Sequence, residues 1–208
     1  TRLRPSGTQG PPAASFESFA RYQHEQAWTW EHMALCRARA LYGSAEARAE
    51  LQGIVHDVLK APLDAEKLQA DVLEMRATMA EHKPAKGPLD VKLARGGLVD
   101  LEFLVHFTQL RTGHGLTADL RGAIAALAQD GLLPDTLVAA HDALTRFLVA
   151  ARLLAPDVSE LLPGPRAALA RACACGDWEA VEAGLLTARK NVASVWQSTF
   201  AQALEVTA

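Results

Sequence analysis

The sequence predicts an all-α protein, a bundle of several helices. Alanine and leucine dominate the 208 residues, and both residues favour helix. β-branched residues rarely cluster, whereas strands are rich in them. Turn-forming residues recur at intervals that suit helices. Because the expected connections are short and the helices long, antiparallel neighbours in a multi-helix bundle are the favoured arrangement.

The composition is that of a globular protein. Half of the residues are hydrophobic, 22% are charged and the formal net charge is −3, so no excess of positive charge indicates a general binder of nucleic acid or membranes. No apolar run reaches the roughly 18 residues that span a bilayer. The sequence also shows no secretory signal. We therefore expect a cytoplasmic protein.

The three cysteines are Cys36, Cys173 and Cys175. An odd count with a Cys-Ala-Cys spacing does not suggest a disulfide framework. A zinc site needs about four ligands, and no second pair of cysteines or histidines stands at finger spacing. We interpret all three as small, buried or half-buried residues of a reduced protein.

In the first part of the chain, helices are expected after three N-cap residues, Ser15, Ser44 and Asp64. A tryptophan-rich helix is expected between the first two. The expected ranges are about 15–26, 28–42, 44–60 and from 64 onward. The last of these carries an amphipathic stripe formed by Leu68, Val72, Met75 and Met79.

The segment 83–97 is rich in proline and glycine, which predicts a loop. Its LDVKL stretch would form a short extended piece, and the loop is the expected seam between parts of the chain. Beyond it, five helices are expected, at about 97–111, 119–129 and 134–154, a short one opened by Pro165, and a long one at 178–204.

The opening residues, TRLRPSGTQG, place two arginines two positions apart. On an extended segment Arg2 and Arg4 would face the same side. Ser6 and Gly7 lie in the turn that follows, whose backbone N–H groups could approach an anion. Guanidinium groups bind phosphate oxygens in a bidentate manner, so the segment suits a phosphate chain. An exposed edge strand with solvated arginines explains the same spacing.

The second unusual stretch is AWTWEHMALCRARALYG, residues 27–43. On a continuous helix, Glu31 and Arg37 would share one region with apolar residues, and Arg39 would point roughly the other way. A charge beside tryptophan on a packed helix needs a partner or a site to face. An internal ion pair and a ligand contact are both compatible with this pattern.

The third stretch, KLARGGLVDLEFLVHF, begins at Lys92. Gly96 and Gly97 would let the chain turn sharply into a helix that is apolar nearly all round, a pattern typical of a central helix. Asp100 and Glu102 lie about 200° apart on that helix, so they cannot form a facing acid–base pair.

Each of these two acids therefore needs its own partner, because an isolated buried carboxylate is costly. The cations expected to serve are Lys92, Arg95, Arg37 and Arg39. A structural ion-pair network and an active-site contact both remain open.

Three long motifs, TRLRPSGTQG, YQHEQAWTWEHMALCRAR and VKLARGGLVDLEFLVHF, occur in this order. Together they closely resemble the glutamine synthetase adenylyltransferase family. The specific resemblance covers residues 1–112; beyond that the match is one of helical character. The sequence of the tryptophan motif resembles that of the adenylylating, C-terminal half of such enzymes.

The resemblance implies an enzyme that transfers AMP from ATP to a tyrosine of glutamine synthetase and responds to the PII signalling protein. It implies Mg²⁺, with the metal-binding aspartates before the position of Thr1, so that this chain by itself is expected to be inactive. Residues 1–14 would then be a strand and turn of a nucleotidyltransferase domain, followed by a helical region at 15–112 and a helical bundle at 113–208.

The same resemblance places a set of residues in or beside a nucleotide cleft, none of them as a catalytic group or metal ligand: Arg2, Arg4, Ser6, Gly7, Glu31, Arg37, Arg39, Lys92, Gly96, Gly97, Asp100 and Glu102. Two other functions remain open. One is a non-catalytic helical docking module for glutamine synthetase or PII. The other is part of a PII uridylyltransferase.

Overall fold

A computed structural model describes residues 13–155, 158 and 161–207. These residues form α-helices and no strand, which confirms the all-α prediction for the described part. The chain divides into two units: unit 1 is Thr1–Met75 with Val105–Leu127, and unit 2 is Arg76–Leu104 with Ala128–Ala208. The predicted extended stretch 1–14 falls almost wholly outside the described residues. The predicted domain limits stay a prediction.

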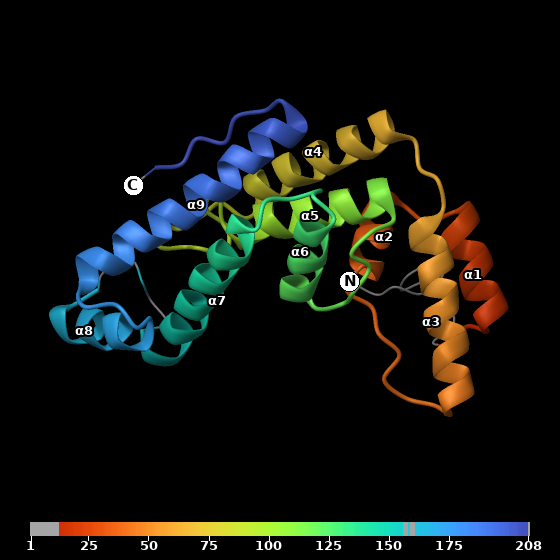
Figure 1. Cartoon of the computed structure of the whole chain (residues 1–208), viewed down its shortest axis with the longest axis horizontal. Helices are drawn as coiled ribbons and strands as arrows, with labels where there is room; N and C mark the ends of the chain where they lie inside the picture. Colours follow the sequence, from red (N-terminus) through yellow and green to blue (C-terminus); the bar gives the residue numbers. More distant parts are fainter. Residues whose placement is uncertain (1–12, 156–157, 159–160, 208) are drawn as a thin grey trace. The chain divides into compact units, whose positions relative to one another are not determined.

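Unit 1 is built from helices whose starts follow the predicted caps. Ser15 accepts a hydrogen bond from the Ser18 N–H, and Ser44 accepts one from the Ala47 N–H, both at 3.2 Å. Asp64 caps the fourth helix in the same way. The helices that contribute to this unit are α1 (Phe16–Glu25), α2 (Thr29–Leu35), α3 (Ala45–Lys60), the first part of α4 (Ala65–His82), the second part of α5 (Leu98–Thr112) and most of α6 (Leu120–Gln129). Figure 1 shows α1 beside α3, against which it packs.

The tryptophan-rich helix is shorter than predicted. It ends at Leu35, and the next two turns are closed by bonds of the i→i−3 type, from the Arg37 N–H to Ala34 and from the Ala38 N–H to Leu35. Helices gain most of their stability by burying an apolar face, but Tyr42 is 98% exposed. Continuing the helix would bury little, so the wheel positions predicted beyond Leu35 are wrong.

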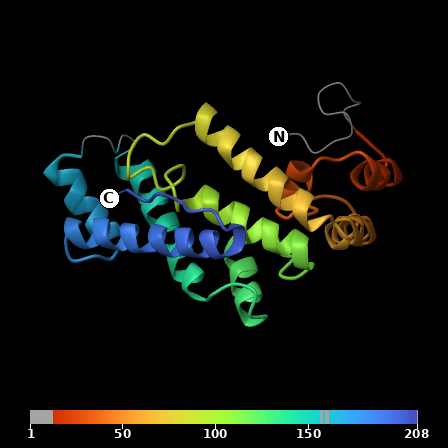
Figure 2. The ribbon, with the colours of Figure 1, turned by 90° about the horizontal axis from the view of Figure 1, so that it is seen from above.

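Unit 2 contains three helices that pack on one another, α7 (Thr136–Leu154), α8 (Pro163–Ala172) and α9 (Trp178–Phe200). Figures 1 and 2 show this group, with α9 drawn in blue. Large side chains are fully buried within it, namely Leu144, Phe147, Leu169, Val192 and Trp196. Burial of side chains of this size stabilises a fold by about 1.5–3 kcal/mol each.

The segment 83–97 is a loop, as predicted, but its LDVKL stretch is not extended. The Asp90 N–H donates to the Gly87 carbonyl and the Ala94 N–H donates to the Asp90 carbonyl, so the chain winds through consecutive turns. These turns bring loop carbonyls over the start of α5, which an extended segment could not do. The two last helices also differ slightly from prediction: α8 begins at Pro163, and α9 ends at Phe200, before the left-handed Ala201.

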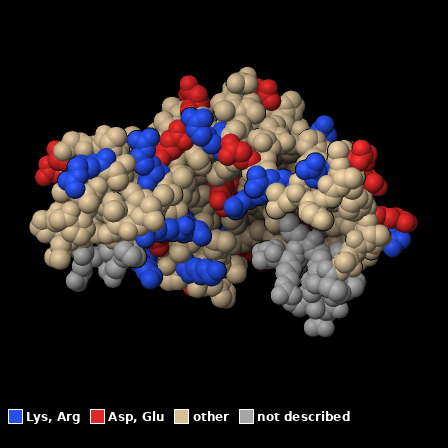
Figure 3. Space-filling view, turned by 90° about the horizontal axis from the view of Figure 1, so that it is seen from below, with Lys and Arg blue, Asp and Glu red and all other residues tan. Residues whose placement is uncertain are grey.

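The described surface carries charges of both signs, as the face drawn in Figure 3 illustrates. None of the described helices is long and apolar enough to cross a membrane. The predicted character of α5 is confirmed, because its apolar side chains are buried on nearly every side.

Candidate functional site

The predicted cleft residues fall into three groups. Arg2, Arg4, Ser6 and Gly7 lie outside the described residues. Glu31, Arg37 and Arg39 belong to unit 1. The set around the double glycine, Lys92, Gly96, Gly97, Asp100 and Glu102, belongs to unit 2.

Glu31 is the third residue of α2 and is only 2% exposed. Its carboxylate accepts the Trp28 N–H at 3.0 Å, which satisfies a backbone donor that the helix start leaves without an intrahelical partner. It also accepts the Tyr22 hydroxyl, at 3.1 Å and 3.2 Å from the two oxygens. These neutral donors explain why an acid is tolerated beside tryptophan.

The surroundings of Tyr22 change its pKa. Partial burial, the hydrogen bond to Glu31 and the negative charge of that carboxylate raise the pKa of Tyr22 above its ordinary value. Each of these causes disfavours the phenolate. The hydroxyl therefore stays a donor, and it joins α1 to the start of α2.

Arg37 and Arg39 follow the end of α2, and both are exposed. Because the helix ends at Leu35, neither arginine occupies the helical position that the sequence predicted. The thiol of neighbouring Cys36 is buried, which raises its pKa to about 12. As predicted, Cys36 is a buried small residue, and Cys173 and Cys175 are half-buried and free.

Asp100 is the third residue of α5 and is fully buried. One carboxylate oxygen accepts the Arg76 Nε–H in a close ion pair, and the other accepts the Gly96 N–H at 2.6 Å. Arg76, itself 2% exposed, also donates from Nη2 to the Leu93 carbonyl at 3.1 Å. We call Arg76, Leu93, Gly96 and Asp100 the Asp100 anchor.

Arg76 was not among the cations predicted to pair with Asp100. A signal was present, because Arg76 follows Leu68 and Val72 at four-residue spacing on the apolar stripe of α4. A cation on such a stripe needs a buried partner. Arg95 lies nearby: burial and the neighbouring Arg76 charge lower its pKa, although Asp100 acts in the opposite direction.

Arg189 is a second buried cation that the sequence reading missed. It is 3% exposed on α9, and its guanidinium donates to three backbone carbonyls. Nε donates to Arg95 at 3.0 Å, and Nη1 donates to Pro88 at 3.2 Å and to Thr207 at 2.9 Å. Burial lowers the pKa of Arg189, and Asp100 partly opposes this shift. The loop 83–97 is thus fastened to α9 as well as to α5.

The two glycines are required by close backbone contacts. Gly96 has φ +74°, and a Cβ there would lie 2.2 Å from the Arg189 carbonyl oxygen. A Cβ on Gly97 would lie 2.5 Å from the Val91 carbonyl oxygen. The same loop caps α5, since Val91 and Lys92 carbonyls accept the Leu98 and Val99 N–H groups at 2.9 Å and 3.1 Å.

Within unit 2, the structure therefore places three of the predicted residues in one cluster, namely Gly96, Gly97 and Asp100. Lys92 lies on the same loop with an exposed side chain, and Glu102 is half-buried on α5. For Asp100, the ion pair with Arg76 and the hydrogen bond from the Gly96 N–H account for the two carboxylate oxygens. Across the residues that the structure describes, no group of three His, Cys, Asp or Glu could hold a metal ion.

Comparison with protein families gives two matches. Residues 1–54 match the family described as glutamate-ammonia ligase adenylyltransferase. Residues 66–200 match the family described as GlnD PII-uridylyltransferase.

The chain is also similar to curated proteins named bifunctional glutamine synthetase adenylyltransferase/adenylyl-removing enzyme. The one from Brucella suis biovar 1 is 39% identical over 194 residues, 89% of this chain and 20% of that protein. The one from Agrobacterium fabrum is 36% identical over 185 residues, 85% of this chain and 19% of that protein. The one from Mesorhizobium japonicum is 50% identical over 103 residues, 50% of this chain and 10% of that protein. The chain spans about a fifth of the length of the first two relatives.

Proposed function

Since the chain belongs to the glutamine synthetase adenylyltransferase family, we propose that it is part of an enzyme that transfers AMP from ATP to a tyrosine of glutamine synthetase. The carrying observation is the 39% identity to the Brucella suis enzyme over 89% of the chain. The three ordered motifs point to the same family. The partners would be ATP, glutamine synthetase and the PII protein.

The proposed reaction is an in-line attack of the tyrosine hydroxyl oxygen on the α-phosphorus of ATP. The new bond joins the tyrosyl oxygen to the α-phosphorus, and the bond from the α-phosphorus to the α–β bridging oxygen breaks. Pyrophosphate leaves, and the phenolic proton is released to solvent. Positioning and charge stabilisation carry most of the catalysis in such transfers. Mg²⁺ would supply charge neutralisation when bound, although among the described residues no group of three His, Cys, Asp or Glu could hold it.

The described residues would contribute in two ways. Glu31 and Asp100 hold helix starts through their own hydrogen bonds, so they act as positioning residues. Arg37, Arg39 and Lys92 carry exposed cationic groups, and we assign them contacts to phosphate oxygens, along with Arg2 and Arg4. Cationic side chains are strong partners of such oxygens.

The test uses the enzyme that contains this chain, with ATP labelled at the α-phosphate and purified glutamine synthetase. Label on glutamine synthetase is the expected result. Arg4→Ala and Lys92→Ala should each lower kcat/KM by about tenfold to a hundredfold, the loss of one charge-assisted contact. Arg48→Ala, an exposed arginine on α3, is the matched control and should have no effect. Unchanged kinetics for Arg4→Ala and Lys92→Ala would remove both residues from the cleft.

A second candidate rests on the match of residues 66–200 to the PII-uridylyltransferase model. It predicts transfer of UMP from UTP to PII instead. The same assay with labelled UTP and PII separates the two candidates. Label on PII from UTP, and none on glutamine synthetase from ATP, would overturn the adenylyltransferase proposal.

We also propose that the 208-residue chain does not transfer AMP by itself, because the resemblance places the metal-binding aspartates at positions outside this sequence. Incubation of the isolated chain with ATP, Mg²⁺ and glutamine synthetase should leave the synthetase unlabelled. Robust labelling would contradict this proposal. Binding of glutamine synthetase without labelling would favour a docking role for the chain.

A further inference from the structure

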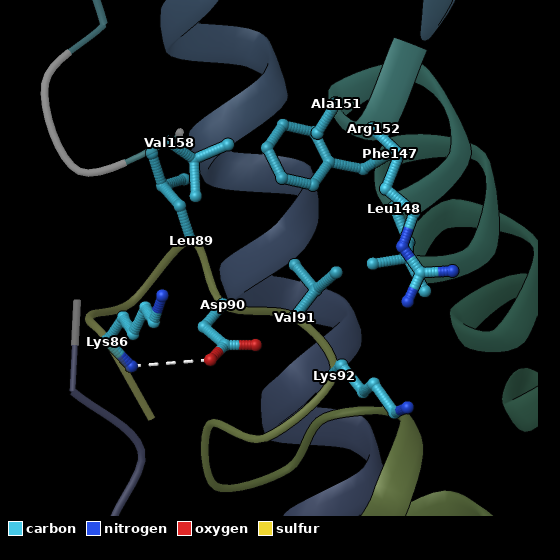
Figure 4. Close-up of a pocket in the computed structure, with 10 residues that line it drawn as sticks. All are labelled: Lys86, Leu89, Asp90, Val91, Lys92, Phe147, Leu148, Ala151, Arg152 and Val158. Carbon is cyan, nitrogen blue, oxygen red and sulfur yellow. Dashed lines mark hydrogen bonds between the residues drawn. The ribbon is translucent and has the colours of Figure 1, made fainter. Parts of the chain in front are cut away.

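A hollow of about 480 Å³ lies in unit 2 between the loop 83–97 and α7. Its volume is within the range of about 300–1,000 Å³ that is usual for small-molecule sites. Figure 4 shows the side chains that line it. None of its features is used by the proposed transfer except Lys92.

The wall of the hollow is apolar. Val91 from the loop and Phe147 and Ala151 from α7 are buried in the wall, with exposed fractions of 1%, 1% and 6%. Leu89 and Leu148 extend the wall on its two sides. Such a surface suits the hydrocarbon or aromatic part of a ligand.

The rim is cationic. Lys86 and Lys92 come from the loop, on either side of Asp90, and Arg152 comes from the last turn of α7. All three are exposed. Among the described residues, none of these three head groups forms an ion pair.

Among the described residues that line the hollow, Asp90 is the one acid, and its carboxylate is already engaged. Its two oxygens accept the backbone N–H groups of Lys86 and Leu93, each at 3.2 Å. The described lining residues carry three positive charges and one negative charge, a net charge of +2. A single carboxylate would neutralise half of this, whereas a phosphate monoester carries about −1.5 to −2 at neutral pH.

We propose that this hollow binds a small phosphate ester that carries an apolar or aromatic group. The phosphate would lie between Lys92 and Arg152, which Figure 4 draws on one side of the hollow, and the apolar group would lie against the half-buried Leu89 and Leu148. The site goes beyond the proposed AMP transfer but shares Lys92 with it. Its occupancy is measured by phenyl phosphate binding and by variants of Arg152 and Lys86, which the transfer does not use, so failure of binding and failure of AMP transfer are distinguishable.

The probe is phenyl phosphate, titrated into the 208-residue chain by calorimetry and followed by amide shifts in NMR spectra. Saturable binding with shifts at Val91 and Leu148 is expected. Inorganic phosphate should bind at least about fivefold more weakly because it lacks the ring, and benzyl alcohol should not bind. Adenosine monophosphate serves as an additional arm: tighter binding than phenyl phosphate identifies the ester as a nucleotide, and weaker binding identifies a smaller ester.

Arg152→Gln should weaken phenyl phosphate binding about tenfold, the change that about 1.4 kcal/mol produces. Lys86→Gln should weaken it less, because Figure 4 draws Lys86 on the other side of Asp90. Arg171→Gln is the matched control, because Arg171 is also an exposed arginine in the last turn of a helix, α8, but does not line the hollow. All three side chains are exposed, so the variants should fold, which circular dichroism verifies.

Absence of binding at millimolar phenyl phosphate would overturn the proposal. So would binding that Arg152→Gln leaves unchanged. Equal affinity for inorganic phosphate and phenyl phosphate would overturn the assignment of an apolar group to the ligand.

Discussion

Two buried acids, Glu31 in unit 1 and Asp100 in unit 2, occupy the same position in their helices and are held in different ways. Each is the third residue of its helix and reaches back to a backbone N–H at the helix start, that of Trp28 for Glu31 and that of Gly96 for Asp100. The remaining hydrogen bond to Glu31 comes from the neutral Tyr22 hydroxyl. For Asp100 it comes from the Arg76 guanidinium.

The difference indicates that the partner of a buried acid determines how much stability is lost when the acid is replaced. A carboxylate held by neutral donors can be replaced by an amide that still accepts those hydrogen bonds. When one member of a buried ion pair is removed, the other charge is left in a low-dielectric environment, which costs several kcal/mol. The Asp100 anchor should therefore be far more sensitive to substitution than the Glu31 cap.

The largest effect is expected for Asp100→Asn. The substitution keeps the shape of the side chain but leaves Arg76 charged and buried, so the free energy of unfolding should fall by about 3–5 kcal/mol. Chemical denaturation of the 208-residue chain measures it. In a double-mutant cycle, Arg76→Met with Asp100→Leu should cost clearly less than the sum of the single changes. Additive costs would show that the two residues are not coupled.

Gly96→Ala should be the next most damaging change. The new Cβ would lie 2.2 Å from the Arg189 carbonyl oxygen at a φ of +74°, and the combined strain and overpacking should cost about 2–4 kcal/mol. Gly184→Ala on α9 is the control, since a Cβ there meets nothing within 4 Å and should stabilise the helix by about 0.5–1 kcal/mol. Equal stability of the two variants would contradict the close contact.

On the Glu31 side, Trp28→Ala keeps the backbone N–H that donates to Glu31 and should leave this cap intact.

Smaller effects are expected at the Glu31 cap. Tyr22→Phe removes a hydrogen bond to a charged acceptor and should cost about 1.5–3 kcal/mol at most, and Glu31→Gln should cost about 1 kcal/mol. Denaturation of both variants beside Asp100→Asn tests the comparison directly. If Glu31→Gln proved as costly as Asp100→Asn, the two acids would not differ as proposed.

The smallest effect concerns pH. Folding raises the pKa of Tyr22, so the associated stabilisation is fully present below its unfolded value, near pH 10. It is lost as the pH rises through the higher folded value. As the pH rises above about 10, the parent chain should therefore lose more stability than Tyr22→Phe. If the free energy of unfolding fell equally with pH in the two proteins above about pH 10, this result would contradict the raised pKa of Tyr22.

Much of the fold could be predicted from local signals. Ser15, Ser44 and Asp64 identified helix starts because capping depends on nearby residues. The end of α2 could not be predicted, because nothing in the sequence tells that Tyr42 gains no burial. Local chemistry sets where helices begin more firmly than where they end.

The candidate site was predicted only in part for a related reason. Gly96, Gly97 and Asp100 belong to one motif, and they also lie close together in the structure. Their partners Arg76 and Arg189 lie 24 and about 90 residues away in the chain, and pairing over such separations is set by tertiary packing. An arginine on an apolar helix face was the available signal for both.

The bond from Arg189 to the Arg95 carbonyl spans 94 residues of sequence. At synthesis rates of about 5–20 residues per second, Arg189 is added roughly 5–20 s after the loop that it holds. During that interval on the ribosome, the loop 83–97 lacks its hydrogen bonds from Arg189 of α9. The order of translation therefore makes this loop one of the last parts of the chain to reach its final conformation.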